Sequence, residues 1–133
     1  MKRLKRIALA VISLPLILAG LLILYEALGM GVNHLATRRQ TKQLIANLKA
    51  EVPDIELIDV YSETGNTSGT GNHVDCLSSV TFSTKMQRTD LENKLFQRYP
   101  YDERGCFLSQ TEDGAYLFYL NTSAPFADNI EGH

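Results

Sequence analysis

The hydrophobic positions of this chain form one long uninterrupted run near the N-terminus and shorter, alternating runs after it. The long run covers residues 7–24, contains no charged residue and directly follows the basic sequence MKRLKR. Eighteen helical residues span about 27 Å, close to the hydrocarbon thickness of a bilayer, about 30 Å. The pattern therefore predicts a transmembrane anchor at residues 7–28, preceded by a basic end at residues 1–6.

A removable signal peptide is the alternative interpretation of this run. The apolar stretch is longer than the usual signal-peptide core, and Leu28 and Met30 disfavour a cleavage site after it. We therefore expect an uncleaved anchor in the cell membrane and keep a cleaved, secreted protein as an alternative. Four basic residues precede the run, whereas Arg38, Arg39 and Lys42 follow it. This bias favours a cytoplasmic N-terminus and a C-terminal domain outside, periplasmic or extracellular.

The segment after the anchor, residues 29–43, is largely polar and includes the run TRRQTKQ. It predicts a solvated juxtamembrane stalk. Leu44, Ile45 and Leu48 then recur at helical spacing, which predicts a helix that docks on a following domain and ends before Pro53.

Further along, β-branched and alternating apolar residues predict four strands. Leu91 and Leu95 predict a second helix between the second and third strands, and Pro100 ends it. A loop rich in glycine and threonine joins the first two strands, and Asp113-Gly114 favours a tight turn between the last two. The strands are expected at residues 54–62, 73–84, 105–110 and 115–121.

This order of elements, α-β-β-α-β-β, predicts an α+β fold after the transmembrane helix. We expect a two-layer domain at residues 44–121, with a four-stranded antiparallel sheet and two helices on one face, and a polar tail at residues 122–133. The tandem α-β-β units of residues 34–121 resemble the periplasmic ferredoxin-like domains of secretion and pilus inner-membrane platform subunits. The resemblance is one of architecture, and it implies a subunit of an envelope or secretion assembly.

Charge and cysteine content narrow the functional classes. Beyond Glu26, nine Lys and Arg oppose fourteen Asp and Glu, so the expected exported part carries a net charge near −5. This charge argues against a nucleic-acid binder and against a domain that lies on anionic lipid. Cys76 and Cys106 form an even pair, so we expect a disulfide between them. Two buried free thiols are the alternative and would fit a cytoplasmic domain.

Residues that could carry chemistry are few. His73 and Asp75 share one face of the second predicted strand, whereas Cys76 points to the other, so the three do not converge on one metal ion. We expect no catalytic, cofactor-binding or metal-binding site, and no cofactor. A small exported enzyme or metal-binding protein that uses His73 and Asp75 remains an alternative.

The last predicted strand is apolar on both faces, because residues 115–120 read AYLFYL. Helices on one side of the sheet leave its other face bare, so a protein partner, a second copy or the tail through Phe126 should cover it. We therefore predict a membrane-anchored, non-enzymatic protein-interaction domain that binds a protein partner or itself through this bare face, and no nucleic acid. The candidate interface residues are Phe107, Tyr116, Leu117, Phe118 and Tyr119.

Overall fold

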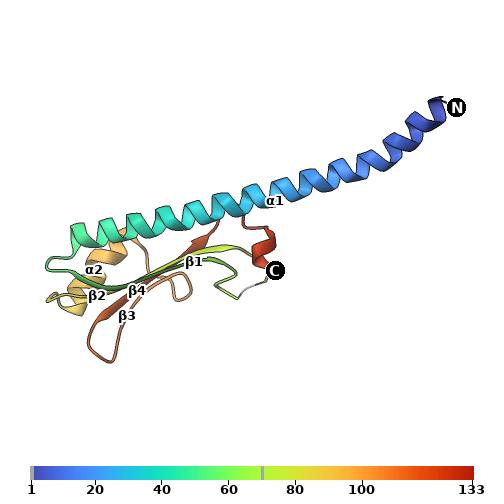
Figure 1. The fold of residues 1–133 in the computed structure, drawn as a ribbon. Coiled ribbons are helices and arrows are strands. Elements are labelled where there is room, and N and C mark those ends of the chain that lie inside the picture. The colour runs from blue at the N-terminus through green and yellow to red at the C-terminus, as the bar shows by residue number, and fades with distance from the viewer. Residues whose placement is uncertain (1, 70) are drawn as a thin grey trace.

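The structure is a computed structural model that describes the backbone of residues 2–69 and 71–133, and all their side chains except those of residues 2 and 4–9. Its longest element is one helix, α1 (Lys2–Glu51), which runs from the apolar segment into the domain without interruption (Figure 1). The predicted stalk is helical because Arg, Gln, Lys and Leu favour helix, and the proline inside α1 is far away at Pro15. A continuous helix, and not a hinge, therefore joins the apolar segment to the domain.

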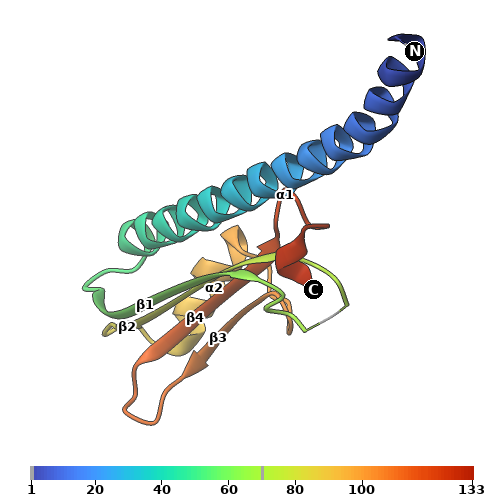
Figure 2. The same cartoon turned by 45° about the vertical axis from the view of Figure 1, so that its right-hand side comes forward.

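Four strands, a second helix and a short 3-10 helix follow α1. In chain order they are β1 (Glu56–Gly65), β2 (Asp75–Ser83), α2 (Arg88–Arg98), β3 (Cys106–Gln110), β4 (Tyr116–Ser123) and η1 (Ile130–Gly132). The strands form an antiparallel sheet of order β1-β2-β4-β3 (Figure 2). Because α2 connects β2 to β3 and β4 lies between those two strands, the arrangement is a split β-α-β unit of the ferredoxin-like kind. The predicted α+β fold is confirmed.

Both helices pack on one face of the sheet, which we call the covered face, and the main core lies there. Leu44 and Leu48 of α1 and Leu91 and Leu95 of α2 are fully buried against Phe118 of β4. Removal of this apolar surface from water is the main force that holds the layers together. The predicted two-layer packing is therefore confirmed.

N-terminal to Leu44, α1 contacts the sheet through polar side chains. Thr41 Oγ1 lies 2.7 Å from Ser78 Oγ, and Gln40 Nε2 donates a hydrogen bond of 2.8 Å to the Cys76 carbonyl. Thr37 and Thr41 are buried, so the prediction of a solvated stalk is wrong for them. Polar side chains can lie inside when partners satisfy them, and the sheet supplies those partners. We call four α1 residues the polar seam: Asn33, Thr37, Gln40 and Thr41.

The predicted Cys76–Cys106 disulfide is absent, and both thiols are free and buried. Cys76 lies on β2 and pairs with Thr122 of β4, whereas Cys106 lies on β3 and pairs with Leu120 of β4. The two cysteines are therefore two strand spacings apart, about 9.6 Å, plus an offset along the strands. A disulfide requires Cα atoms within about 7 Å, so the inserted strand β4 excludes this bridge.

The C-terminal tail packs on α1 and does not cover the face of the sheet opposite the two helices. The ring of Phe126 contacts that of Tyr25 edge-on, with centroids 5.8 Å apart. The Asn33 side chain receives the Phe126 N–H and donates to its carbonyl, both at 2.9 Å. Asn129 Nδ2 donates to the Glu26 carbonyl at 3.0 Å. The alternative in which Phe126 covers the bare sheet face is therefore wrong.

Candidate functional site

The face of the sheet opposite α1 and α2, which we call the open face, is the candidate site. Strand register assigns its residues: because Val80 and Phe82 are buried under the helices, the residues between and beside them point the other way. In Figure 2, α2 lies behind the sheet and α1 runs above it, so neither of these helices covers this face. The open face consists of Asp59, Tyr61 and Glu63 of β1; Asp75, Leu77, Ser79 and Thr81 of β2; Phe107 and Ser109 of β3; and Leu117, Tyr119 and Asn121 of β4.

A row of aromatic residues crosses the open face. Tyr61 pairs with Ser79, Ser79 with Tyr119 and Tyr119 with Phe107, so β1, β4 and β3 each contribute one aromatic residue and Ser79 of β2 lies between Tyr61 and Tyr119. The Tyr119 and Phe107 rings are stacked, with centroids 4.6 Å apart and planes 15° from parallel. Tyr61 at the β1 edge is half exposed. Flat, rigid aromatic surface of this kind is enriched in the energetic centres of protein interfaces.

Acidic side chains surround the β1 and β2 end of this row. Asp59 and Glu63 flank Tyr61 on the open face of β1, and the Tyr61 hydroxyl donates to Glu63 Oε2 at 2.5 Å. Burial, together with the nearby charges of Asp75 and Glu63, raises the pKa of Tyr119. The open face bears no Lys or Arg among the described residues of the four strands. Its electrostatic potential is therefore negative beside an aromatic surface.

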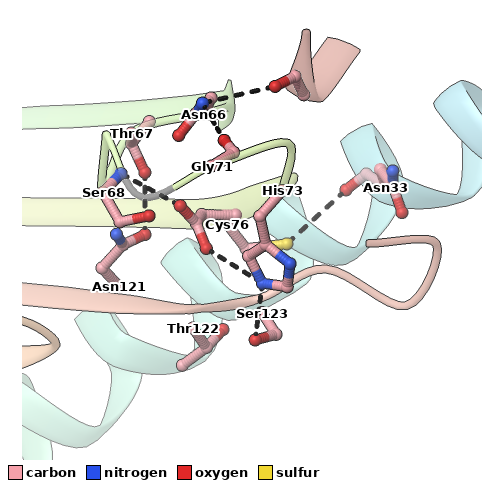
Figure 3. A network of polar contacts seen from close by, with 12 residues as sticks. Asn33, Asn66, Thr67, Ser68, Gly71, His73, Cys76, Asn121, Thr122 and Ser123 are labelled. Carbon is pink, nitrogen blue, oxygen red and sulfur yellow. Dashed lines mark hydrogen bonds and ion pairs between the residues drawn. The ribbon is translucent and has the colours of Figure 1, made fainter. Parts of the chain in front are cut away.

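The loop between β1 and β2 folds over one end of the open face. Thr67 Oγ1 donates to Asn121 Oδ1 at 3.0 Å, and the Ser68 N–H donates to Asp75 Oδ2 at 3.0 Å (Figure 3). Leu77, which pairs with Asn121 on the same face, is only 8 % exposed. The loop thus closes this end of the face, and the part that remains open is the aromatic row and the residues beyond it.

His73 and Asp75 lie together, as the sequence predicted, and Cys76 points to the covered face. His73 Nε2 is 2.9 Å from Ser123 Oγ and 3.4 Å from Asp75 Oδ1 (Figure 3). A Ser-His-Asp catalytic triad needs the hydroxyl and the carboxylate on different ring nitrogens, whereas both contacts here use the same one. The adjoining cavity is about 230 Å³, below the range of most ligand sites. The geometry is that of a structural hydrogen-bond cluster.

Possible metal ligands and the two thiols were the remaining candidates for chemistry. Within residues 2–69 and 71–133, no three His, Cys, Asp or Glu side chains gather as they would around a metal ion. Burial, with a smaller effect of the Asp102 carboxylate, raises the pKa of Cys106 to about 11, and burial also raises that of Cys76. Thiols of this kind stay protonated and are poor nucleophiles.

The five predicted interface residues divide between the two faces of the sheet. Phe107, Leu117 and Tyr119 lie on the open face, partly exposed, whereas Tyr116 and Phe118 are buried in the core of the covered face. An apolar run cannot by itself show which of its alternate residues face the helices. Tyr61 was missed, although its position between Asp59 and Glu63 in an alternating strand carries the signal that could have found it.

No family model, curated protein or solved structure matches this chain.

Proposed function

We propose that this chain is a single-pass membrane protein whose domain binds a protein partner through the open face and carries out no reaction of its own. The observation that carries this proposal is the aromatic row of Tyr61, Tyr119 and Phe107, which come from three of the four strands and are left uncovered by the tail. The partner that fits is an apolar protein segment with basic residues, because the acidic groups lie beside Tyr61 and Tyr119. A second copy would bring like charges together.

The apolar half of α1 supports membrane anchoring. Leu16 is 68 % exposed and Ile23 is 70 % exposed, and the most apolar window of α1 has no buried residue. A core helix of a soluble protein would bury such residues inside the protein, whereas here a bilayer is the solvent that would cover them. Retention of the segment is supported by the tail, because cleavage near residue 32 would remove Tyr25, Glu26 and Gly29, which contact it.

The orientation we propose, with a cytoplasmic N-terminus and an extracytoplasmic domain, is supported by the flanking basic residues. The free thiols do not oppose export, because burial protects both from exchange. An accessible cysteine placed by Tyr101→Cys, at a 59 % exposed position, should react with a membrane-impermeant maleimide on intact cells. Reaction only after lysis would contradict the orientation.

Photo-crosslinking in cells tests the binding role. A photoreactive residue at Tyr61 should give a discrete product that is lost on Phe107→Asp or at high salt and retained on His73→Ala. The same residue at Tyr101, which packs beside α2 and is similarly exposed, should not give that product. A product of twice the chain mass would show self-association instead, and loss of the product on His73→Ala alone would favour a role for the His73 cluster.

A further inference from the structure

The side of α1 that faces away from the sheet continues the apolar surface of the anchor beyond the end of the apolar run. At about 100° per residue, Leu28 and Leu35 lie on nearly the same line, with Val32 beside them. These three side chains are 60 %, 47 % and 40 % exposed. They lie about 180° around the helix from Thr37 and Leu48, which face the sheet. We call this side the outer face.

The apolar boundary of α1 is therefore oblique. On the sheet side the first polar residue after the run is Glu26, whereas on the outer face apolar residues persist to Leu35, about 13 Å further along the axis. A membrane surface perpendicular to the helix would give the same boundary on both sides. An oblique boundary is expected when the helix leaves the bilayer at a tilt, with the outer face turned toward the lipid.

Basic residues end the apolar stripe. Arg39 and Lys42 continue the outer face beyond Leu35 and Arg38 lies on its flank; all three are exposed, and among the described residues none of them has an acidic partner. Charge is divided sharply along the chain: residues 27–51 carry four basic and one acidic residue, whereas residues 52–133 carry five basic and thirteen acidic. The net charge of about −5 for residues 27–133 is therefore the sum of +3 for the helix segment and −8 for the domain.

The shape of α1 agrees with this placement. In both views the N-terminal third of the helix bends toward the side opposite the sheet (Figures 1 and 2). Pro15 lies within this third and removes a backbone hydrogen bond there. If the N-terminal third crosses a membrane, this bend tilts the rest of α1 toward the membrane surface. The outer face is then the side of α1 that lies closest to that surface.

We propose that the outer face of α1 is a binding surface for anionic lipid, and this proposal rests on the anchor proposed above. Leu28, Val32 and Leu35 lie in the interfacial zone, and the basic residues Arg38, Arg39 and Lys42 bind lipid phosphates. The acidic domain on the opposite side of α1 is then held away from the surface. The long helix thus orients the open face as well as tethering it.

Tryptophan fluorescence of the full chain in lipid vesicles tests the proposal, because the protein contains no tryptophan of its own. Leu35→Trp is the reporter, Leu18→Trp in the apolar run reports insertion itself, and Tyr101→Trp is a solvent-exposed control. In vesicles that contain phosphatidylglycerol, Leu35→Trp should emit at shorter wavelength than Tyr101→Trp. Lipids brominated near the headgroup should quench Leu35→Trp and not Tyr101→Trp.

Charge reversal separates headgroup binding from simple contact with lipid. Arg38→Glu/Arg39→Glu should lose most of the quenching at Leu35→Trp, whereas the equal charge change Lys85→Glu/Arg104→Glu in the domain should retain it. Equal quenching in neutral and anionic vesicles would overturn the proposal, as would solvent-like emission at Leu35→Trp with Leu18→Trp still quenched. The emission of Leu35→Trp could instead shift to shorter wavelength as the protein-to-lipid ratio rises, without quenching by brominated lipid. That result would overturn the proposal and indicate that a second copy of the chain covers the outer face. If lipids brominated deep in the acyl chains also failed to quench Leu18→Trp, that result would instead contradict the anchor proposed above.

Discussion

The two faces of the sheet are built by the same alternation of residues and have opposite surroundings. On the covered face, Phe118 is fully buried under both helices, whereas on the open face Phe107 remains partly exposed and stacks on Tyr119. Burial of the first aromatic stabilises the fold. Phe107 contributes less to stability because it stays partly exposed, which leaves its ring available for a contact outside the chain. The comparison separates residues that hold this protein together from residues that are free to bind.

The largest expected effect comes from truncation of matched aromatic residues on the two faces. Phe118→Ala should lower the free energy of unfolding by about 3–5 kcal/mol because it leaves a cavity in the core. Phe107→Ala should cost about 0.5–1.5 kcal/mol, the value of a lost aromatic stack. Denaturant unfolding of the full chain in detergent micelles measures both. Equal losses would mean that the open face is part of the core and would break the comparison.

The polar seam gives the next effect, on the covered face alone. Gln40→Ala should destabilise the fold by about 1–3 kcal/mol, because the Cys76 carbonyl and the Thr122 hydroxyl lose a partner. Gln43→Ala, three residues on and exposed, is the matched control and should change stability by less than about 0.5 kcal/mol. If the two variants unfold alike, the predicted solvated stalk was the better description.

The position of the tail tests whether the open face is truly bare. A Cβ atom at Gly29 would lie 2.7 Å from Asn129 Nδ2 and 3.3 Å from the Phe126 ring, whereas one at Gly31 would meet nothing within 4 Å. Gly31→Ala should therefore stabilise α1 by about 1 kcal/mol, and Gly29→Ala should lose that gain by displacing the tail. Faster amide exchange at Phe126 in Gly29→Ala alone is the expected signature. Slow exchange in both variants would place the tail elsewhere.

A pH dependence is expected on the covered face. Burial raises the pKa of Cys106 from 9.0 to about 11, so the folded protein holds this proton more tightly than the unfolded chain. The resulting stability is fully present below pH 9 and is lost as the pH rises toward about 11. Unfolding curves of the parent chain and of Cys106→Ala should converge over that interval. Parallel pH profiles would show that the thiol is not buried as described.

Local patterns in the sequence predicted the strands, the second helix and the apolar segment, because each depends on residues close in the chain. Strand order depends on distant contacts, and the insertion of β4 between β2 and β3 could not be read from alternation. That insertion explains why the disulfide prediction failed. The prediction of a solvated stalk failed at Thr37 and Thr41 for the same reason, because their hydrogen-bond partners lie on strands distant in the sequence. Three of the five candidate interface residues were placed on the open face only once the register was known.

Footprinting of tyrosines by hydroxyl radicals in native membranes is the most direct test of the open face as a binding surface. Tyr61 on the open face is 50 % exposed and Tyr101 beside α2 is 59 % exposed, so the two should react similarly in the purified chain. In membranes from cells that produce the protein, we predict that Tyr61 is protected and Tyr101 is not. Equal modification of both tyrosines in membranes and in the purified chain would contradict the proposed function.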